Sequence, residues 1–134
     1  MQKILIIEDE PEVRVLLARR LRASRFEILE TGDGTAGFQK AKEAKPDLII
    51  LDLKMPGEDG LQIYRSMRKE PELQKVPVMF LTAISTGGKM GRESLALIAL
   101  AKHGFELGGN YEVMGKPYDS KRLLETIRRM LGEP

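Results

Sequence analysis

Leu48-Ile49-Ile50-Leu51-Asp52 is the stretch that decides the fold. Its four apolar residues are consecutive rather than alternating, which is typical of a parallel strand that is covered on both faces. Ile4 to Ile7 and Val76 to Leu81 have the same character, and a polar residue follows each of them. Two weaker runs, Phe26 to Leu29 and Tyr111 to Met114, are predicted to be strands nearer an edge of the sheet.

Helical periods lie between these runs, because apolar residues recur at spacings that place them on one helix face. The predicted faces are Val13, Leu16, Leu17 and Leu21; Leu61, Tyr64 and Met67; and Leu123, Leu124, Ile127 and Leu131. Pro11 suits the first turn of the first helix, and Asp119 or Ser120 can cap the last one. The alternation predicts an α/β fold of the flavodoxin-like kind: a five-stranded parallel sheet of order 2-1-3-4-5, with helices on both faces.

Length and composition restrict the class of protein. A chain of 134 residues with 42% apolar residues suits one compact domain, so we expect residues 1–134 to form a single domain with no output domain. Its 22 basic and 20 acidic residues nearly balance, so no strong field favours nucleic acid or acidic lipid. There is no cysteine, and the apolar runs are too short for a signal peptide or a membrane span. We therefore expect a soluble, cytoplasmic protein.

Acidic residues follow two strands that are neighbours in the predicted order. Glu8 and Asp9 come after the first strand and Asp52 ends the third, and the carboxyl ends of parallel strands meet at one edge of a sheet. Two like charges about 4 Å apart repel by roughly 4 kcal/mol at an effective dielectric constant near 20, so this cluster calls for a cation. Oxygen ligands suit Mg²⁺ better than a softer metal, and the sequence therefore predicts a Mg²⁺ site.

Thr82 and Lys116 belong to the other two strands that end at this edge. The hydroxyl of Thr82 can donate a hydrogen bond, and the ammonium group of Lys116 can pair with the same phosphoryl oxygens. With Asp52 as nucleophile, they supply what phosphoryl transfer to a carboxylate needs. Each residue alone has a structural explanation, as a helix cap, a turn residue or a solvated lysine. The agreement of four strand ends favours a functional site.

In this order, the residues resemble the receiver domain of bacterial two-component response regulators. The motifs that carry the resemblance are Glu8-Asp9, Leu51-Asp52-Leu53-Lys54-Met55-Pro56-Gly57 with a turn that closes at Gly60, Leu81-Thr82-Ala83, and Lys116-Pro117. Each motif is common alone, but together they are highly specific and they extend over almost the whole chain. The resemblance implies a phosphoacceptor signalling switch rather than an enzyme, with self-catalysed phosphorylation and dephosphorylation at most.

The resemblance also implies roles for individual residues. Asp52 would become a phosphoaspartate, and Mg²⁺ would be held by Asp9, Asp52 and the backbone carbonyl of Lys54. Glu8 would assist the ion indirectly, through water. Thr82 would reorient toward the phosphoryl group, and Lys116 would pair with it.

The partners implied by the resemblance are proteins. The phosphodonor would be a phosphohistidine on a histidine kinase or on a histidine phosphotransfer protein, and a separate effector protein would read the switch. Neither direct nucleic-acid binding nor membrane binding is expected. Arginines of the first helix form a basic patch, which we interpret as an ordinary solvated face that could also attract an acidic partner. These are Arg14, Arg19, Arg20, Arg22 and Arg25.

The chain departs from the family pattern in two places. Val113 stands where receivers usually carry a switching Tyr or Phe, and Tyr111 lies two residues earlier, which moves the ring by about 7 Å along a strand. This departure questions the usual coupling of an aromatic ring to Thr82. The segment 84–108, in the expected fourth loop and helix, is about a dozen residues longer than receivers usually have there. One hypothesis is that this fourth-helix region is a homodimer or effector contact.

Three alternative functions remain open. A degenerate receiver would bind partners without phosphorylation. A hydrolase of the haloacid-dehalogenase type would use Asp52 as nucleophile, but such enzymes carry a second acid at the position of Lys54. Gly32, Gly34 and Gly37 spell a G-x-G-x-x-G dinucleotide fingerprint, yet they follow the second strand rather than the first.

Overall fold

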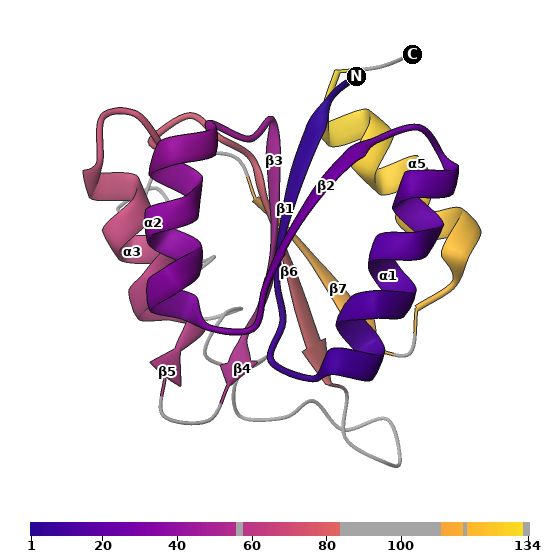
Figure 1. Cartoon of the computed structure of the whole chain (residues 1–134), viewed down its shortest axis with the longest axis horizontal. Helices are drawn as coiled ribbons and strands as arrows, with labels where there is room; N and C mark the ends of the chain where they lie inside the picture. Colours follow the sequence, from indigo (N-terminus) through magenta and orange to yellow (C-terminus); the bar gives the residue numbers. More distant parts are fainter. Residues whose placement is uncertain (56–57, 84–110, 117, 133–134) are drawn as a thin grey trace.

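A five-stranded parallel sheet forms the centre of the protein, in the order β2-β1-β3-β6-β7 (Figure 1). The computed structural model describes residues 1–55, 58–83, 111–116 and 118–132. The strands are β1 (Lys3–Ile7), β2 (Glu27–Thr31), β3 (Leu48–Asp52), β6 (Val78–Ala83) and β7 (Tyr111–Lys116). Counted along the chain, these five strands have the order 2-1-3-4-5, which confirms the prediction. The two weakest apolar runs, β2 and β7, are the edge strands, as expected.

Helices cover both faces of this sheet, which confirms the predicted layers. In Figure 1, α1 (Pro11–Ala23) and α5 (Ser120–Met130) lie on one side, while α2 (Gly34–Ala44) and α3 (Gly60–Lys69) lie on the other. Pro11 begins α1, where its missing N–H group costs no helical hydrogen bond. Asp119 caps α5, because its side chain accepts a hydrogen bond of 3.1 Å from the backbone N–H of Lys121.

The consecutive apolar runs are explained by burial on both faces. Residues 4–7 of β1 and 48–51 of β3 are all fully buried. Alternate side chains enter two separate cores: Ile4 and Ile6 pack toward α1 and α5, whereas Leu5 and Ile7 pack toward α2 and α3. A strand in this environment has no solvent-facing position, so its sequence does not alternate.

One predicted core residue and the predicted start of the fourth strand are wrong. On α1, Leu16 was expected in the core, but its side chain is 52% exposed, and the buried stripe is Leu17, Ala18 and Leu21. Successive helical residues are turned by about 100°, so a stripe centred on Leu17 leaves Leu16 at its margin. The fourth strand begins at Val78 rather than at residue 76, because the carbonyl group of residue 76 accepts a side-chain hydrogen bond of 2.8 Å from Arg68 instead of continuing the ladder.

A short hairpin that the sequence did not predict follows β3. It pairs β4 (Lys54–Met55) with β5 (Glu58–Asp59) in an antiparallel arrangement. The extended segment 84–108, on which we based the hypothesis of a dimer or effector contact, lies outside the described residues.

The glycines of the G-x-G-x-x-G pattern have structural explanations. Asp33, between the first two, is the N-cap of α2 and accepts a hydrogen bond of 2.8 Å from the N–H of Thr35. A Cβ atom on Gly37 would lie only 2.6 Å from Cδ1 of Ile7, so this glycine lets α2 approach β1 closely. Gly37 therefore serves the packing of α2 against the sheet.

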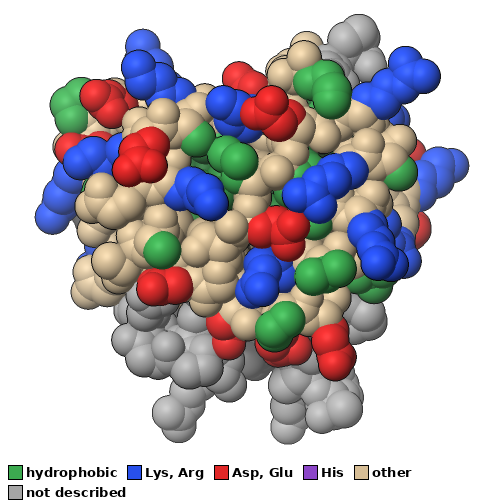
Figure 2. Space-filling model, viewed as in Figure 1, with side chains coloured by type: hydrophobic (Ala, Val, Ile, Leu, Met, Phe, Trp, Pro, Cys, Tyr) green, Lys and Arg blue, Asp and Glu red, His purple; other side chains and the backbone are tan. Residues whose placement is uncertain are grey.

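The visible surface has mixed charge. On the face shown in Figure 2, the Lys and Arg side chains are interspersed with Asp and Glu, in keeping with a chain of nearly balanced charge. Within the part of the chain that the structure describes, no helix combines the length and the hydropathy that a membrane span requires.

Candidate functional site

The carboxyl ends of β1, β3, β6 and β7 lie along one edge of the sheet. In the register of β1 with β3, Ile7 faces Leu51, so the next residues, Glu8 and Asp52, fall beside each other. Asp52 faces Leu81 of β6, which places Thr82 one residue beyond it. The sheet topology therefore brings the predicted nucleophile next to residues from two neighbouring strands.

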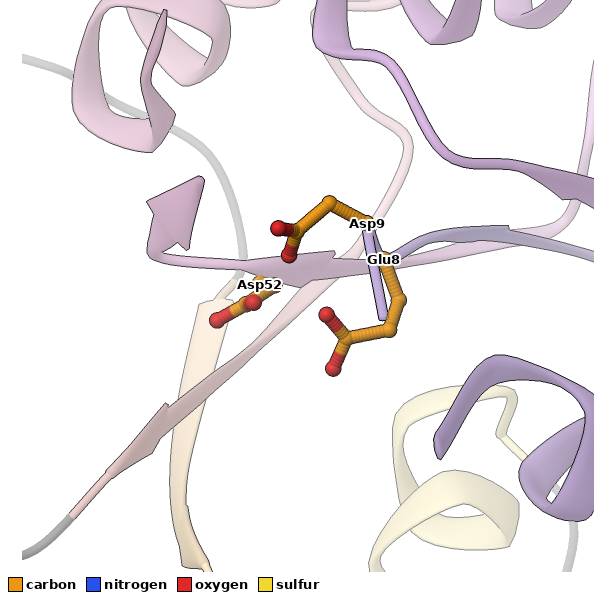
Figure 3. A group of neighbouring side chains, drawn as sticks. All are labelled: Glu8, Asp9 and Asp52. Carbon is orange, nitrogen blue, oxygen red and sulfur yellow. The ribbon is translucent and has the colours of Figure 1, made fainter. Parts of the chain in front are cut away.

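Three carboxylates gather at this edge. One oxygen from each of Glu8, Asp9 and Asp52 lies within 4.8 Å of the others, and their side chains surround a common space (Figure 3). Glu8 is fully buried and Asp52 is 4% exposed, whereas Asp9 is half-buried. Such closely spaced negative charges, largely withdrawn from water, require a cation or hydrogen-bond donors.

The backbone around Glu8 is held from both sides. Its N–H donates to the carbonyl of Thr31 over 3.0 Å, and its carbonyl accepts a hydrogen bond of 2.7 Å from Nη1 of Arg14. The N–H of Glu10 lies 3.4 Å from the Glu8 carboxylate, at the N-terminal end of α1, where the helix dipole favours negative charge.

Arg14 corrects our interpretation of the basic patch. The sequence grouped it with solvated arginines, but it is half-buried, and it contacts the backbone of a site residue. Arg19, Arg20 and Arg25 are exposed, as that interpretation expected. No sequence pattern indicates this contact, because any residue offers a backbone carbonyl as an acceptor. The contact requires only that the side chain at position 14 is a donor of sufficient length.

The start of α3 lies close to the backbone of Asp52 and Leu53. The N–H of Leu53 donates to the carbonyl of Leu81 over 2.9 Å, and the N–H of Gly60 lies 3.3 Å from the carbonyl of Leu53. A Cβ atom on Gly60 would lie 2.8 Å from the Leu53 carbonyl oxygen and 2.9 Å from that of Asp52. Because these are backbone atoms, which cannot swing away, only glycine fits at this turn.

Three further predicted residues are placed by their backbones, and their side chains are outside what the structure describes. Lys54 begins β4, two residues after Asp52. Thr82 pairs with Gly115, and Lys116 pairs with Ala83, so both stand at the ends of adjacent strands. This placement puts Thr82 and Lys116 at the same edge of the sheet as the carboxylates.

Tyr111 does not replace the missing aromatic at position 113. Its ring packs edge-on against Tyr64 and Phe80, with ring centroids 5.9 Å and 6.1 Å away. Burial raises the pKa of Tyr111, and the neighbouring Tyr64 raises it further. Gly115 is the strand partner of Thr82, and Tyr111 lies four residues before it, about 13 Å along the strand. Val113 is 43% exposed.

Comparison with known families decides the classification. Residues 4–128 match the model of the response regulator receiver domain. This chain is a response regulator receiver domain. In receiver domains the acidic edge of the sheet binds Mg²⁺, and the domain acts as a phosphoacceptor signalling switch rather than as a conventional enzyme. Receiver domains interact with histidine kinases or phosphotransfer proteins and with effectors.

Individual relatives are similar over the whole receiver domain. The polar-differentiation response regulator DivK of Brucella anthropi is 30% identical over 134 residues, with 99% of each chain covered. The phosphate regulon transcriptional regulatory protein PhoB of Rhizobium meliloti is 32% identical over 131 residues. This chain spans about half of the length of that protein, 52%. The solved structure of Vibrio cholerae chemotaxis protein CheY4 has a TM-score of 0.78 at 25% identity, with 97% of this chain and 98% of that chain covered.

Proposed function

We propose that this receiver domain accepts a phosphoryl group on Asp52 from a phosphohistidine, with Mg²⁺ bound at Asp9 and Asp52. The donor would be a histidine kinase or a histidine phosphotransfer protein, and a separate effector protein would recognise the phosphorylated form. The observation that carries this proposal is the spacing of 4.8 Å or less among the oxygens of Glu8, Asp9 and Asp52. The degenerate alternative, a receiver that is not phosphorylated, gives no reason for keeping these charges together.

The donor set fits Mg²⁺. The ion takes oxygen ligands at about 2.0 to 2.1 Å in octahedral geometry, so two oxygens on one ion lie at most about 4.2 Å apart. We expect small side-chain rotations to bring one oxygen of Asp9 and one of Asp52 within that limit, and Glu8 would act through a bound water. We propose the backbone carbonyl of Lys54 as the third protein ligand. When bound, the ion lowers the repulsion between Asp52 and the incoming phosphoryl group.

The proposed transfer is a direct displacement at phosphorus. A carboxylate oxygen of Asp52 forms the new O–P bond while the P–N bond of the phosphohistidine breaks, and the electron pair of that bond stays on the imidazole nitrogen. The hydroxyl of Thr82 would donate to one phosphoryl oxygen, and the ammonium of Lys116 would pair with another. Water reverses the modification by attacking phosphorus and releasing Asp52. We propose both steps as self-catalysed.

The phosphoryl group carries a charge of about −2, in place of the single negative charge of the Asp52 carboxylate. We propose that this charge draws Thr82 and Lys116 toward it, and that their movement alters the surface that the effector recognises. The output would be a change in protein affinity, without direct binding to nucleic acid or to a membrane. A homodimer through residues 84–108 remains a hypothesis on residues outside the described part. A monomer by sedimentation at high concentration, with and without a phosphoryl mimic, would exclude it.

Intact mass spectrometry tests the proposal. The protein is incubated with acetyl phosphate and Mg²⁺, and we expect a gain of one phosphoryl group. The variant Asp52→Asn should gain none, whereas Glu43→Gln, an equal loss of charge at an exposed position on α2, should behave like the wild type. Chelation of Mg²⁺ should abolish the gain. Continuous hydrolysis of the donor would indicate a phosphatase instead, and no gain in any variant would indicate a phosphorylation-independent binding module.

A further inference from the structure

The peptide between Glu8 and Asp9 lies outside regular secondary structure. Strand β1 ends at Ile7 and helix α1 begins at Pro11, so neither the sheet ladder nor the helix fixes this peptide. The N–H of Glu8 is anchored to β2 through the carbonyl of Thr31. Its carbonyl is anchored to α1 through Nη1 of Arg14, over 2.7 Å. A guanidinium donor makes this a strong hydrogen bond.

This contact bears directly on Asp9. The carbonyl of Glu8 and the N and Cα atoms of Asp9 belong to one planar peptide group, which rotates as a unit. A donor that holds the carbonyl therefore also fixes the direction in which the side chain of Asp9 leaves the backbone. Since Asp9 is only half-buried, packing alone constrains its carboxylate less than that of Glu8.

Arg14 is itself held in place by two features of the second strand and its loop. Its Nε lies 3.6 Å from a carboxylate oxygen of Glu30 on β2. Its Nη1 passes over Gly32, where a Cβ atom would lie 2.8 Å from it. Any side chain at position 32 would have to displace the guanidinium. Glu30 thus attracts the guanidinium group and Gly32 leaves room for it, in the position from which Nη1 donates to the carbonyl of Glu8.

We propose that Arg14 is a positioning residue for the Mg²⁺ site, acting through the peptide between Glu8 and Asp9. The inference rests on the proposed function of that site. Two effects of removing Arg14 oppose each other: loss of a nearby positive charge strengthens cation binding, and loss of the anchor weakens it. Anchors behind metal ligands are commonly worth about 10- to 100-fold in affinity, and the anchor effect prevails here.

The test measures the Kd for Mg²⁺ by calorimetry in three variants. Arg14→Ala removes the anchor, and Gly32→Ala displaces the guanidinium without removing its charge. Arg19→Ala removes an equal charge from an exposed position on the same helix. We expect the first two to weaken Mg²⁺ binding by about fivefold or more. The control should stay within about twofold of the wild type.

A second readout separates positioning from a general loss of stability. In the metal-free protein, the backbone amide NMR signal of Asp9 should shift in Arg14→Ala and Gly32→Ala but not in Arg19→Ala. Unchanged or tighter Mg²⁺ binding in Arg14→Ala, or an unchanged Kd in Gly32→Ala, would overturn the inference while the wild type still binds Mg²⁺. A wild type that binds no Mg²⁺ would instead overturn the proposed function, and the inference with it.

Discussion

Substitution of Asp52 by asparagine should make the metal-free protein more stable. The oxygens of Asp52, Glu8 and Asp9 lie within 4.8 Å of one another, and at that separation two unit charges repel by about 3.5 kcal/mol at an effective dielectric constant of 20. Solvent screens the half-buried Asp9, and Lys116, expected at the same edge, offsets part of the remaining repulsion. We therefore expect a net gain of about 1 to 2 kcal/mol in the free energy of unfolding.

Addition of Mg²⁺ should reverse the order of stability. At a concentration one hundred times its Kd, a ligand that binds only the folded state stabilises it by about 2.7 kcal/mol. The wild type gains this amount, whereas Asp52→Asn has lost an anionic ligand and gains little. The wild type should therefore be less stable than the variant in chelator and more stable than it in saturating Mg²⁺.

Thermal unfolding followed by circular dichroism is the assay. A change of about 1 to 2 kcal/mol corresponds to roughly 3 to 8 °C in Tm for a domain of this size. The control is Glu43→Gln, which loses the same charge on the exposed face of α2 and should follow the wild type in both conditions. The reasoning fails if Asp52→Asn melts at a lower temperature in chelator, or if Mg²⁺ raises both Tm values equally.

Three other predictions concern the frame that carries the site. Gly37→Ala places a Cβ atom 2.6 Å from a β1 side chain and should cost about 1 to 3 kcal/mol of stability in urea unfolding; an unchanged midpoint would contradict it. Arg68 is buried, and its Nη1 donates to three carbonyl groups within residues 73–76. Arg68→Met should therefore lower the free energy of unfolding by about 2 to 4 kcal/mol in urea unfolding. The control Arg65→Met, at an exposed position on the same helix, should cost almost nothing. Burial raises the pKa of Tyr111 above 10.0 in the folded state, so the stability it contributes is complete below pH 10.0 and is lost as the pH rises through the folded pKa. Urea midpoints of wild type and Tyr111→Phe across that range should differ in slope, and identical slopes would refute the assignment.

The sequence predicted the parts of the site that depend on strand order. Consecutive apolar residues in 4–7 and 48–51 identify strands buried on both faces, and their alternation with helices restricts the sheet to few topologies. Once the first and third strands are neighbours, Glu8 and Asp52 have to fall side by side at the carboxyl edge. The meeting of the carboxylates therefore follows from topology.

The sequence could not predict contacts that depend on side-chain reach. Arg14 belongs to a group of arginines that is typical of a solvated helix face. The space above Gly32 nevertheless lets its guanidinium group turn inward and contact the backbone of Glu8. Leu16 fits the apolar period of α1, but the buried stripe is centred one residue later, on Leu17, and Leu16 is exposed. The position of the Tyr111 ring depends on contacts with Tyr64 of α3 and Phe80 of β6. Both residues are far from Tyr111 in the sequence, so no local pattern predicts these contacts.

The position of the bound ion tests the central claim most directly. Crystals grown with Mn²⁺ in place of Mg²⁺ should show an anomalous difference peak at the carboxyl edge of the sheet, about 2.1 to 2.2 Å from carboxylate oxygens of both Asp9 and Asp52. The same crystals of Asp52→Asn should lose that peak or show it much weakened. Wild-type crystals that hold Mn²⁺ only elsewhere, with no peak between Asp9 and Asp52, would contradict the account.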